Sequence, residues 1–247
     1  MLPLIVLHGF LGQPSHWDTP LSLARLDAHR VTLPGHGPHP WTLPDADFDA
    51  VVDATLARPP FTDVPPPWAL AGYSLGGRLA LSIAARHPHH VRALLLASAS
   101  PGLTDPTARD DRARADDRLA RELVTHGLSA FVSRWEALPL FATQASLPDD
   151  LRALHRAHRL NHQPEAVAWA LSTLSPGRMP PRHDALRSLP MPVHLVTGAL
   201  DLAYTELARA SGRDHTVVPG AGHDVVLEAP AAVASALGSL SRSLDLP

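Results

Sequence analysis

A serine lies between two glycines in the stretch Gly-Tyr-Ser-Leu-Gly at positions 72–76. The apolar run 67–73 before it predicts a buried strand, and the spacing of 75–87 after it predicts a helix. A serine at such a strand-to-helix turn is exposed at the helix N-terminus, where backbone N–H groups point outward. A glycine-rich turn with an ordinary surface serine is the alternative, but the flanking strand and helix favour a nucleophile at Ser74.

A nucleophilic serine needs a base, and the base needs an acid to orient it. Asp201 follows the apolar run 191–198, and His223 follows the run 215–219 in the sequence Gly-Ala-Gly-His. Both residues therefore fall beyond the carboxyl ends of predicted strands, where the active sites of parallel sheets gather. We predict that Ser74, Asp201 and His223 form a catalytic triad.

Two other aspartates compete with Asp201 for the role of the acid. Asp224 is adjacent to His223 in sequence, so we expect its side chain to point elsewhere. Asp184 stands before a helical pattern and is typical of a helix N-cap.

An oxyanion hole requires two converging N–H donors. We expect one from Leu75, directly after the serine, and the other from Phe10 in the loop His-Gly-Phe-Leu-Gly at 8–12. His8 in the same loop is expected to be structural rather than catalytic.

The rest of the chain supplies elements that would position these groups. Apolar runs predict strands at 2–8, 29–33, 67–73, 91–97, 191–198 and 215–219. Helical spacing occurs between them at 48–57, 75–87, 203–211 and 229–244. This alternation predicts an α/β fold with a mostly parallel central sheet and helices on both faces.

Only helical patterns, separated by prolines, occupy the segment between about Pro101 and Pro190. We therefore expect residues 1–100 and 190–247 to form the α/β core, and 101–189 to form an inserted helical cap over the strand ends.

Composition excludes several classes of protein. The 247 residues carry a formal net charge of −3 and no cysteine, so neither a nucleic-acid partner nor a disulfide scaffold is indicated. The first apolar run is too short for a signal peptide, and no run approaches a membrane helix. We expect a cytoplasmic protein, a monomer or small homo-oligomer, that acts on a small molecule without a cofactor. His155, His158 and His162 have helical spacing, but nearby carboxylates in a ligand pattern are missing, and we expect no metal site.

Several motifs together resemble the α/β-hydrolase superfamily. They are GYSLGGR (72–78), LHGFLG (7–12), LPGHG (33–37), PGL (101–103) and GAGHDVVLEAPAAV (220–233). More narrowly, the chain resembles the synthases that form 2-succinyl-6-hydroxy-2,4-cyclohexadiene-1-carboxylate in menaquinone biosynthesis. That resemblance implies a lyase that eliminates pyruvate from a substrate with several carboxylates, with the triad serine acting as a base.

The resemblance also implies which residues bind the substrate. They are Tyr73, Arg78, Arg112, Trp135 and Arg159. For Arg78 the spacing adds support, because it lies about one helical turn past the serine and can stay near it to bind a carboxylate.

Two other functions remain open at this stage. A carboxylesterase or related serine hydrolase would use the same triad for acyl transfer, with an apolar pocket and the arginines turned to solvent. A binding protein without catalysis would be expected to have lost a member of the triad, and all three are present.

Overall fold

A computed structural model of the chain describes residues 2–244, with side chains as far as residue 242. Its centre is a six-stranded sheet in the order β2-β1-β3-β4-β5-β6, and every neighbouring pair is parallel. The strands are β1 (Leu4–Leu7), β2 (His29–Val31), β3 (Trp68–Tyr73), β4 (Val91–Ala97), β5 (Val193–Gly198) and β6 (Asp214–Val218). All six predicted strands are present, and the predicted α/β fold class is confirmed.

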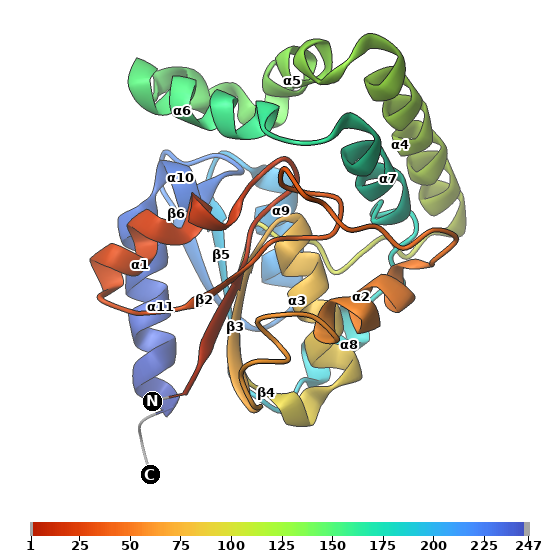
Figure 1. The fold of residues 1–247 in the computed structure, drawn as a ribbon. Helices are drawn as coiled ribbons and strands as arrows, with labels where there is room; N and C mark the ends of the chain where they lie inside the picture. Colours follow the sequence, from red (N-terminus) through yellow and green to blue (C-terminus); the bar gives the residue numbers. More distant parts are fainter. Residues whose placement is uncertain (1, 245–247) are drawn as a thin grey trace.

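Helices cover both faces of the sheet (Figure 1). One face packs against α1 (Asp18–Ala24), α10 (Val225–Glu228) and α11 (Pro230–Leu244). The other face packs against α2 (Phe48–Leu56), α3 (Leu75–Arg86), α8 (His183–Ser188) and α9 (Leu202–Ala210). In the described residues, 2–244, no helix has the length and apolar character needed to cross a membrane.

The segment between β4 and β5 forms a helical layer above the carboxyl ends of the strands (Figure 1). It contains α4 (Pro106–His126), α5 (Leu128–Glu136), the 3-10 segment η3 (Pro139–Ser146), α6 (Asp149–Leu160) and α7 (Pro164–Thr173). Helix α8 lies within the predicted cap, but it packs against α3, and its Leu186 is buried in the core beside the sheet. We therefore propose that the cap consists of α4 to α7.

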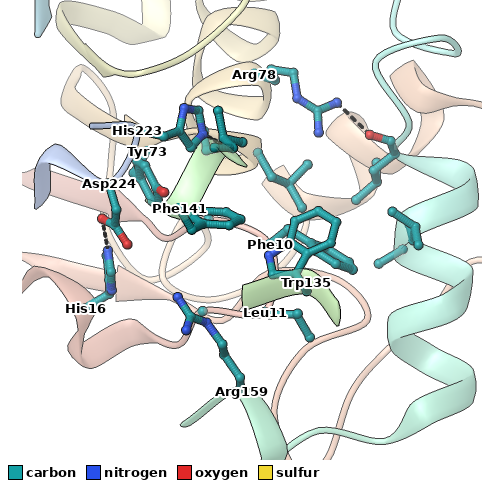
Figure 2. A pocket seen from close by; sticks show the side chains of 18 of the residues that line it. Phe10, Leu11, His16, Tyr73, Arg78, Trp135, Phe141, Arg159, His223 and Asp224 are labelled. Carbon is teal, nitrogen blue, oxygen red and sulfur yellow. Dashed lines mark hydrogen bonds and ion pairs between the residues drawn. The ribbon is translucent and has the colours of Figure 1, made fainter. Parts of the chain in front are cut away.

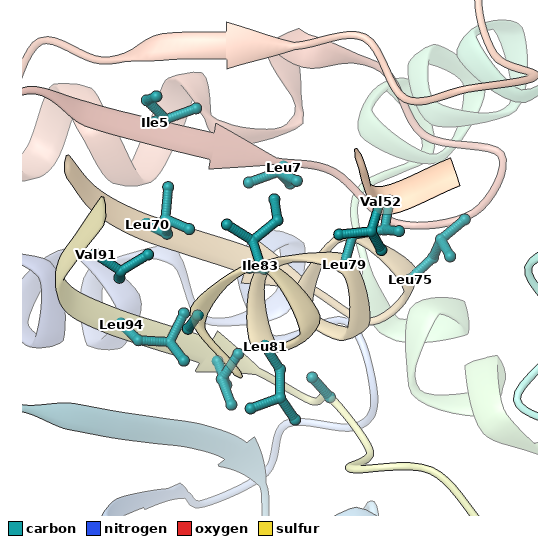
Figure 3. Close-up of a cluster of buried hydrophobic side chains, with 14 of the residues drawn as sticks. Ile5, Leu7, Val52, Leu70, Leu75, Leu79, Leu81, Ile83, Val91 and Leu94 are labelled. Carbon is teal, nitrogen blue, oxygen red and sulfur yellow. The ribbon is translucent and has the colours of Figure 1, made fainter. Parts of the chain in front are cut away.

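Helix α3 is central to the largest cluster of buried hydrophobic side chains (Figure 3). Leu79 and Ile83 are fully buried in the same cluster as Leu7 of β1 and Leu70 of β3. Each such side chain contributes about 1.5–3 kcal/mol through burial, so this packing fixes the start of α3 against the sheet.

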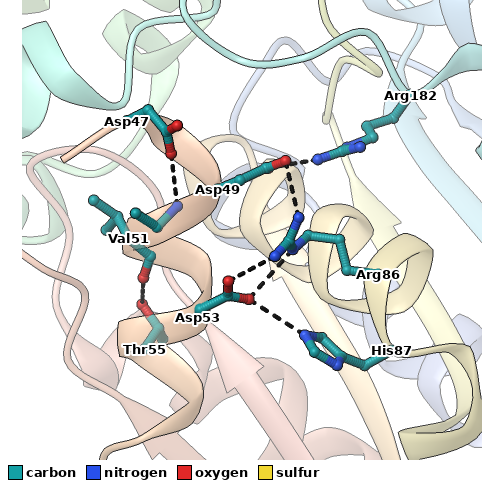
Figure 4. Close-up of polar contacts among 9 residues, drawn as sticks. Asp47, Asp49, Val51, Asp53, Thr55, Arg86, His87 and Arg182 are labelled. Carbon is teal, nitrogen blue, oxygen red and sulfur yellow. Dashed lines mark hydrogen bonds and ion pairs between the residues drawn. The ribbon is translucent and has the colours of Figure 1, made fainter.

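Polar contacts join α2 to α3 on the outer surface (Figure 4). Asp47 caps α2 by accepting the Ala50 N–H at 2.8 Å. Arg86 at the end of α3 donates to Asp53 of α2 at 2.6 Å. These groups are partly exposed, so they orient the helices more than they stabilise the fold.

The sequence patterns missed two short helices, α1 and α10. They also misplaced Asp184, which was expected to be an N-cap. Asp184 is the second residue of α8 and pairs with Arg187, while Arg182 occupies the N-cap position.

The backbone of α3 begins in direct contact with the end of β1. A Cβ atom added at Gly76 would lie 2.3 Å from the carbonyl oxygen of His8 and 2.4 Å from that of Leu7. Both neighbours are backbone atoms, so neither can move aside as a side chain would. Only glycine allows α3 to start this close to β1.

We expect Gly76→Ala to lower the free energy of unfolding by about 2 kcal/mol or more, because the new methyl overlaps backbone atoms. Gly238→Ala is the matched control: a Cβ there meets only the flexible end of Arg242 at 3.4 Å. It should leave stability unchanged or raise it by up to about 1 kcal/mol through helix propensity. Chemical denaturation measures both, and equal stabilities for the two variants would contradict the packing described.

Candidate active site

The site lies where the chain reverses its direction across the sheet. Strands β1 and β3 are neighbours in the sheet. The loop after β1 leads to α1 on one face, and the loop after β3 leads to α3 on the other face. Ligands of open α/β sheets bind in the crevice that forms at such a switch point. Ser74 and residues 9–12 both border this crevice.

Ser74 connects β3 to α3 in a strained conformation. Its φ of 50° and ψ of −110° lie outside the regions that non-glycine residues usually adopt. The Ser74 N–H donates to the carbonyl oxygen of Ala97 at 2.9 Å, which ties the turn to the end of β4. Such strain persists where the surrounding structure fixes it, and here it holds the hydroxyl at the rim of the crevice.

The three residues of the predicted triad lie within hydrogen-bond distance of one another, in the order serine, histidine, aspartate. His223 Nε2 lies 3.1 Å from Ser74 Oγ, and His223 Nδ1 lies 2.7 Å from Asp201 Oδ2. Since a carboxylate accepts, Nδ1–H donates to Asp201 and leaves Nε2 free to accept the serine proton. His223 and Asp201 are buried, with 2% and 6% of their surfaces exposed.

The predicted oxyanion donors border the same cavity as Ser74. Leu75 is the first residue of α3, and Phe10 lies in the loop after β1. Across residues 2–244, no hydrogen-bond acceptor is paired with either of these two backbone N–H groups. Both are therefore available to a bound oxygen atom.

A buried histidine holds the loop that carries the Phe10 N–H. His36 Nε2 accepts the Leu11 N–H at 3.1 Å, and His36 Nδ1 donates to the carbonyl oxygen of Pro34 at 2.9 Å. Leu11 has a φ of 58°, so this bond stabilises an unfavourable turn. Burial lowers the pKa of His36 to about 3, which keeps the ring neutral and able to accept.

His8 has a similar structural role beside it. Its Nδ1 donates to the carbonyl oxygen of Gly9 at 2.8 Å, and its Nε2 accepts the Leu33 N–H at 3.2 Å. Burial holds the pKa of His8 well below its usual value. The ring is fully buried, and neither nitrogen is left for catalysis.

A cavity of about 120 Å³ opens in front of Ser74 and His223. Aromatic side chains line much of it, from both the core and the cap: Phe10, Tyr73, Trp135, Phe141 and Tyr204. The ring of Tyr204 meets His223 edge-on at a centroid distance of 4.5 Å, and Trp135 meets Phe10 at 5.0 Å. These rings give the cavity an apolar wall beside the reacting groups.

Two of the three expected arginines border the cavity on the side of α3 and α4. Arg78 donates to the carbonyl oxygen of Leu174 at 2.6 Å, and burial lowers its pKa to about 10, so it remains a cation at neutral pH. Arg112 donates to Asp116 at 2.8 Å, and Asp116 also accepts from Ser175 at 2.6 Å.

Arg159 enters from α6, across the aromatic residues from Arg78 (Figure 2). It donates to Glu136 at 2.9 Å and to Gln144 at 3.0 Å, and only 11% of its side chain is exposed. All five residues expected to bind the substrate thus line this one cavity.

Asp224 points away from the triad, as expected, and forms a second carboxylate–imidazole pair. His16 Nε2 lies 2.9 Å from Asp224 Oδ1 (Figure 2). Burial alone would raise the pKa of Asp224, but the charge and hydrogen bond of His16 outweigh it and hold that pKa below its usual value. His16 also stacks on Tyr73 at 5.3 Å.

The sequence interpretation missed His16, Phe141 and Tyr204 as residues of the site. Tyr204 could have been found, because it lies three residues after Asp201, on the same side of a helix that begins at the acid. Nothing near His16 in sequence indicates its partner, which lies 208 residues away.

Of the three histidines with helical spacing, His155 and His158 meet edge-on at a ring distance of 5.6 Å, and His162 lies apart. His155 lines the cavity and meets the edge of the His16 ring at 5.4 Å, whereas His162 lies past the end of α6 and accepts the Gly37 N–H at 2.9 Å. Within the described part of the chain, no group of three histidine or acidic residues is arranged to hold a metal ion.

Comparisons with known proteins agree with this architecture. Residues 4–236 match the model of the family described as "Alpha/beta hydrolase family". The chain is 33% identical over 241 residues to the 2-succinyl-6-hydroxy-2,4-cyclohexadiene-1-carboxylate synthase of Enterobacter sp. (strain 638), covering 97% of this chain and 91% of the relative. It is 32% identical to the synthase of the same name from Escherichia coli O1:K1, covering 97% and 93%. Among solved structures, MenH from S. aureus superimposes with a TM-score of 0.88 at 27% identity, covering 98% and 94%.

We expect the neutral His36 to make the fold sensitive to acid. In the unfolded chain a histidine binds its proton below about pH 6.5, whereas folded His36 does so only below about 3. The unfolded state therefore binds more protons between these values, and His36 lowers stability by about 1.4 kcal/mol per pH unit as the pH falls.

His36→Gln keeps a donor and an acceptor but removes the titration. We expect the unfolding free energy of this variant to fall less steeply between about pH 6 and 4, by the slope that corresponds to roughly one bound proton. Denaturation at a series of pH values measures this slope. The exposed His39→Gln is the control and should not change the slope. Identical slopes for wild type and His36→Gln would contradict this account.

Proposed function

The chain belongs to the α/β-hydrolase family, and we propose that it is a carbon–oxygen lyase of menaquinone biosynthesis. Its reaction would convert 2-succinyl-5-enolpyruvyl-6-hydroxy-3-cyclohexene-1-carboxylate into 2-succinyl-6-hydroxy-2,4-cyclohexadiene-1-carboxylate by elimination of pyruvate. We propose that it works in the cytoplasm on this small molecule. The relatives named for the product of this reaction motivate the proposal.

One observation supports a substrate with several carboxylates above all. The cavity beside Ser74 has guanidinium groups on two sides, with Arg78 and Arg112 on one and Arg159 on the other. Each guanidinium has five N–H donors and uses only one or two of them within the protein, so donors remain that a neutral ester would not use. Carboxylates on opposite ends of one molecule would satisfy both sides.

The triad would then act on a proton rather than on an acyl group. Ser74 Oγ accepts the proton from the ring carbon next to the succinyl ketone while its own proton passes to His223 Nε2. Asp201 holds the imidazolium that forms. The N–H groups of Leu75 and Phe10 stabilise the charge on the ketone oxygen.

The electrons of the broken C–H bond complete the elimination. They form a double bond to the next ring carbon, the existing ring double bond shifts by one position, and the carbon–oxygen bond to the enolpyruvyl group breaks. The leaving group departs as the enolate of pyruvate and takes up a proton. The ring is left as the 2,4-diene, with no hydrolysis and no covalent enzyme intermediate.

Ser74→Ala should lower the rate of pyruvate release at least 1000-fold, because the proton acceptor is removed. A coupled lactate dehydrogenase assay on the enolpyruvyl substrate measures this rate, and cleavage of p-nitrophenyl acetate is followed in parallel. Rapid ester cleavage by the wild type, together with no pyruvate release, would replace the lyase by a carboxylesterase. If the wild type catalysed neither reaction, the chain would be a binding protein.

Arg112 and Arg114 provide a matched pair on one helix. Arg112 lines the cavity, whereas Arg114 pairs with Asp111 on the surface, with 64% of its side chain exposed. Arg112→Met should raise KM for the enolpyruvyl substrate about tenfold or more, since a charged hydrogen bond to a carboxylate is lost. Arg114→Met should leave KM unchanged. Equal effects of the two substitutions would remove Arg112 from the binding site.

A further inference from the structure

A second cavity, of about 360 Å³, lies under α6 beside the active-site cavity. Its walls come from the end of α5, from η3, from α6 and from Leu227 of α10. Phe141, His155 and Arg159 line both cavities. A ligand that passes these three side chains would occupy both spaces at once.

The first cavity is small for the proposed substrate. Pockets for drug-sized ligands usually measure about 300–1,000 Å³, and the cavity beside Ser74 has only about 120 Å³. A cyclohexene ring that carries succinyl, enolpyruvyl, hydroxyl and carboxylate groups exceeds that space. The adjacent second cavity offers additional space for part of the molecule.

The charges that line the second cavity favour an anion. Arg152, Arg156 and Arg159 line it with a single acid, Glu136, which pairs with Arg156 and Arg159. Arg152 pairs with Asp149, whose side chain is 91% exposed and lies outside the lining. The remaining lining is mostly small and apolar, from Ala137, Leu138, Ala142, Ala145, Ala153, Leu147 and Leu227. A short methylene chain that ends in a carboxylate matches both features.

Gln144 supplies an unused donor in this cavity. Its side-chain oxygen accepts from Arg159 at 3.0 Å, which fixes the orientation of the amide. Its Nε2 is buried and, among residues 2–244, has no hydrogen-bond partner. Only 8% of Gln144 is exposed. A buried donor without an acceptor is unfavourable and rare in folded proteins, and a small shift of the cavity wall would let a carboxylate accept from it.

We propose that the second cavity is the subsite for the carboxylate-ended acyl arm of the substrate, with Gln144 Nε2 as a donor to its terminal carboxylate. The identity of the arm as succinyl rests on the proposed function. Arg159 and Phe141 then separate the arm from the reacting ring. This arrangement makes Gln144 and the arginines around it determinants of specificity that do not touch the reacting atoms.

Two stable aromatic probes isolate the arm from the chemistry. 2-Succinylbenzoate and 2-butanoylbenzoate share the ring carboxylate and the chain length, and only the first has the terminal carboxylate. By isothermal titration calorimetry we expect the wild type to bind 2-succinylbenzoate at least tenfold more tightly. Gln144→Leu should reduce this ratio to about threefold or less, and Gln163→Leu, an exposed glutamine outside both cavities, should preserve it.

The ratio of the two affinities separates a subsite from a structural role. A misfolded or loosened variant would weaken both probes equally, so an unchanged ratio in Gln144→Leu overturns the proposal. Equal affinities in the wild type, or no binding of 2-succinylbenzoate, also overturn it. Pyruvate release by the wild type is measured separately. If the wild type binds the two probes with a tenfold difference in affinity but releases no pyruvate, the subsite stands and the proposed function is overturned.

Discussion

The contact between the start of α3 and the end of β1 is the constraint on which the site depends. Because no side chain fits at Gly76, the two backbones approach closely enough to bring the Leu75 N–H and the loop of Phe10 to the same crevice. The same turn forces Ser74 into a positive φ and aims its hydroxyl at His223. One packing contact therefore positions the nucleophile and one of the two oxyanion donors, and sets the other donor beside them.

The cavity has charged arginines on the side that a substrate would reach and neutral histidines behind the oxyanion loop. Behind the oxyanion loop, His8 and His36 are kept neutral by burial and act as paired donors and acceptors to the backbone. Facing the cavity, Arg78 stays charged even though burial lowers its pKa. The arrangement gives the loop support from hydrogen bonds without a positive charge behind it.

The sequence could predict what depends on local pattern. The six strands follow from short apolar runs, and Ser74, Asp201 and His223 follow from their places at strand ends. Contacts between distant segments could not be predicted. His16 joins the site through Asp224 and Tyr73, which are both distant from it in sequence. The unsatisfied amide of Gln144 becomes visible only once η3 and α6 are packed together. The misplacement of Asp184 has the same origin, since helix boundaries shift when tertiary contacts decide them.

The orientation of the cap arginines shows how a buried acid resolves an ambiguity in the sequence. The segment 109–118 alternates arginine and aspartate so closely that any of its arginines could face inward. Asp116 is 2% exposed and receives hydrogen bonds from Arg112 and Ser175, which joins α4 to the segment after α7. A buried carboxylate must be paired, so the residue one turn before it turns toward the cavity, while Arg114 pairs with an exposed acid on the surface. Burial of Asp116 therefore fixes which side of α4 faces a substrate, and the guanidinium group of Arg112 lies on that side.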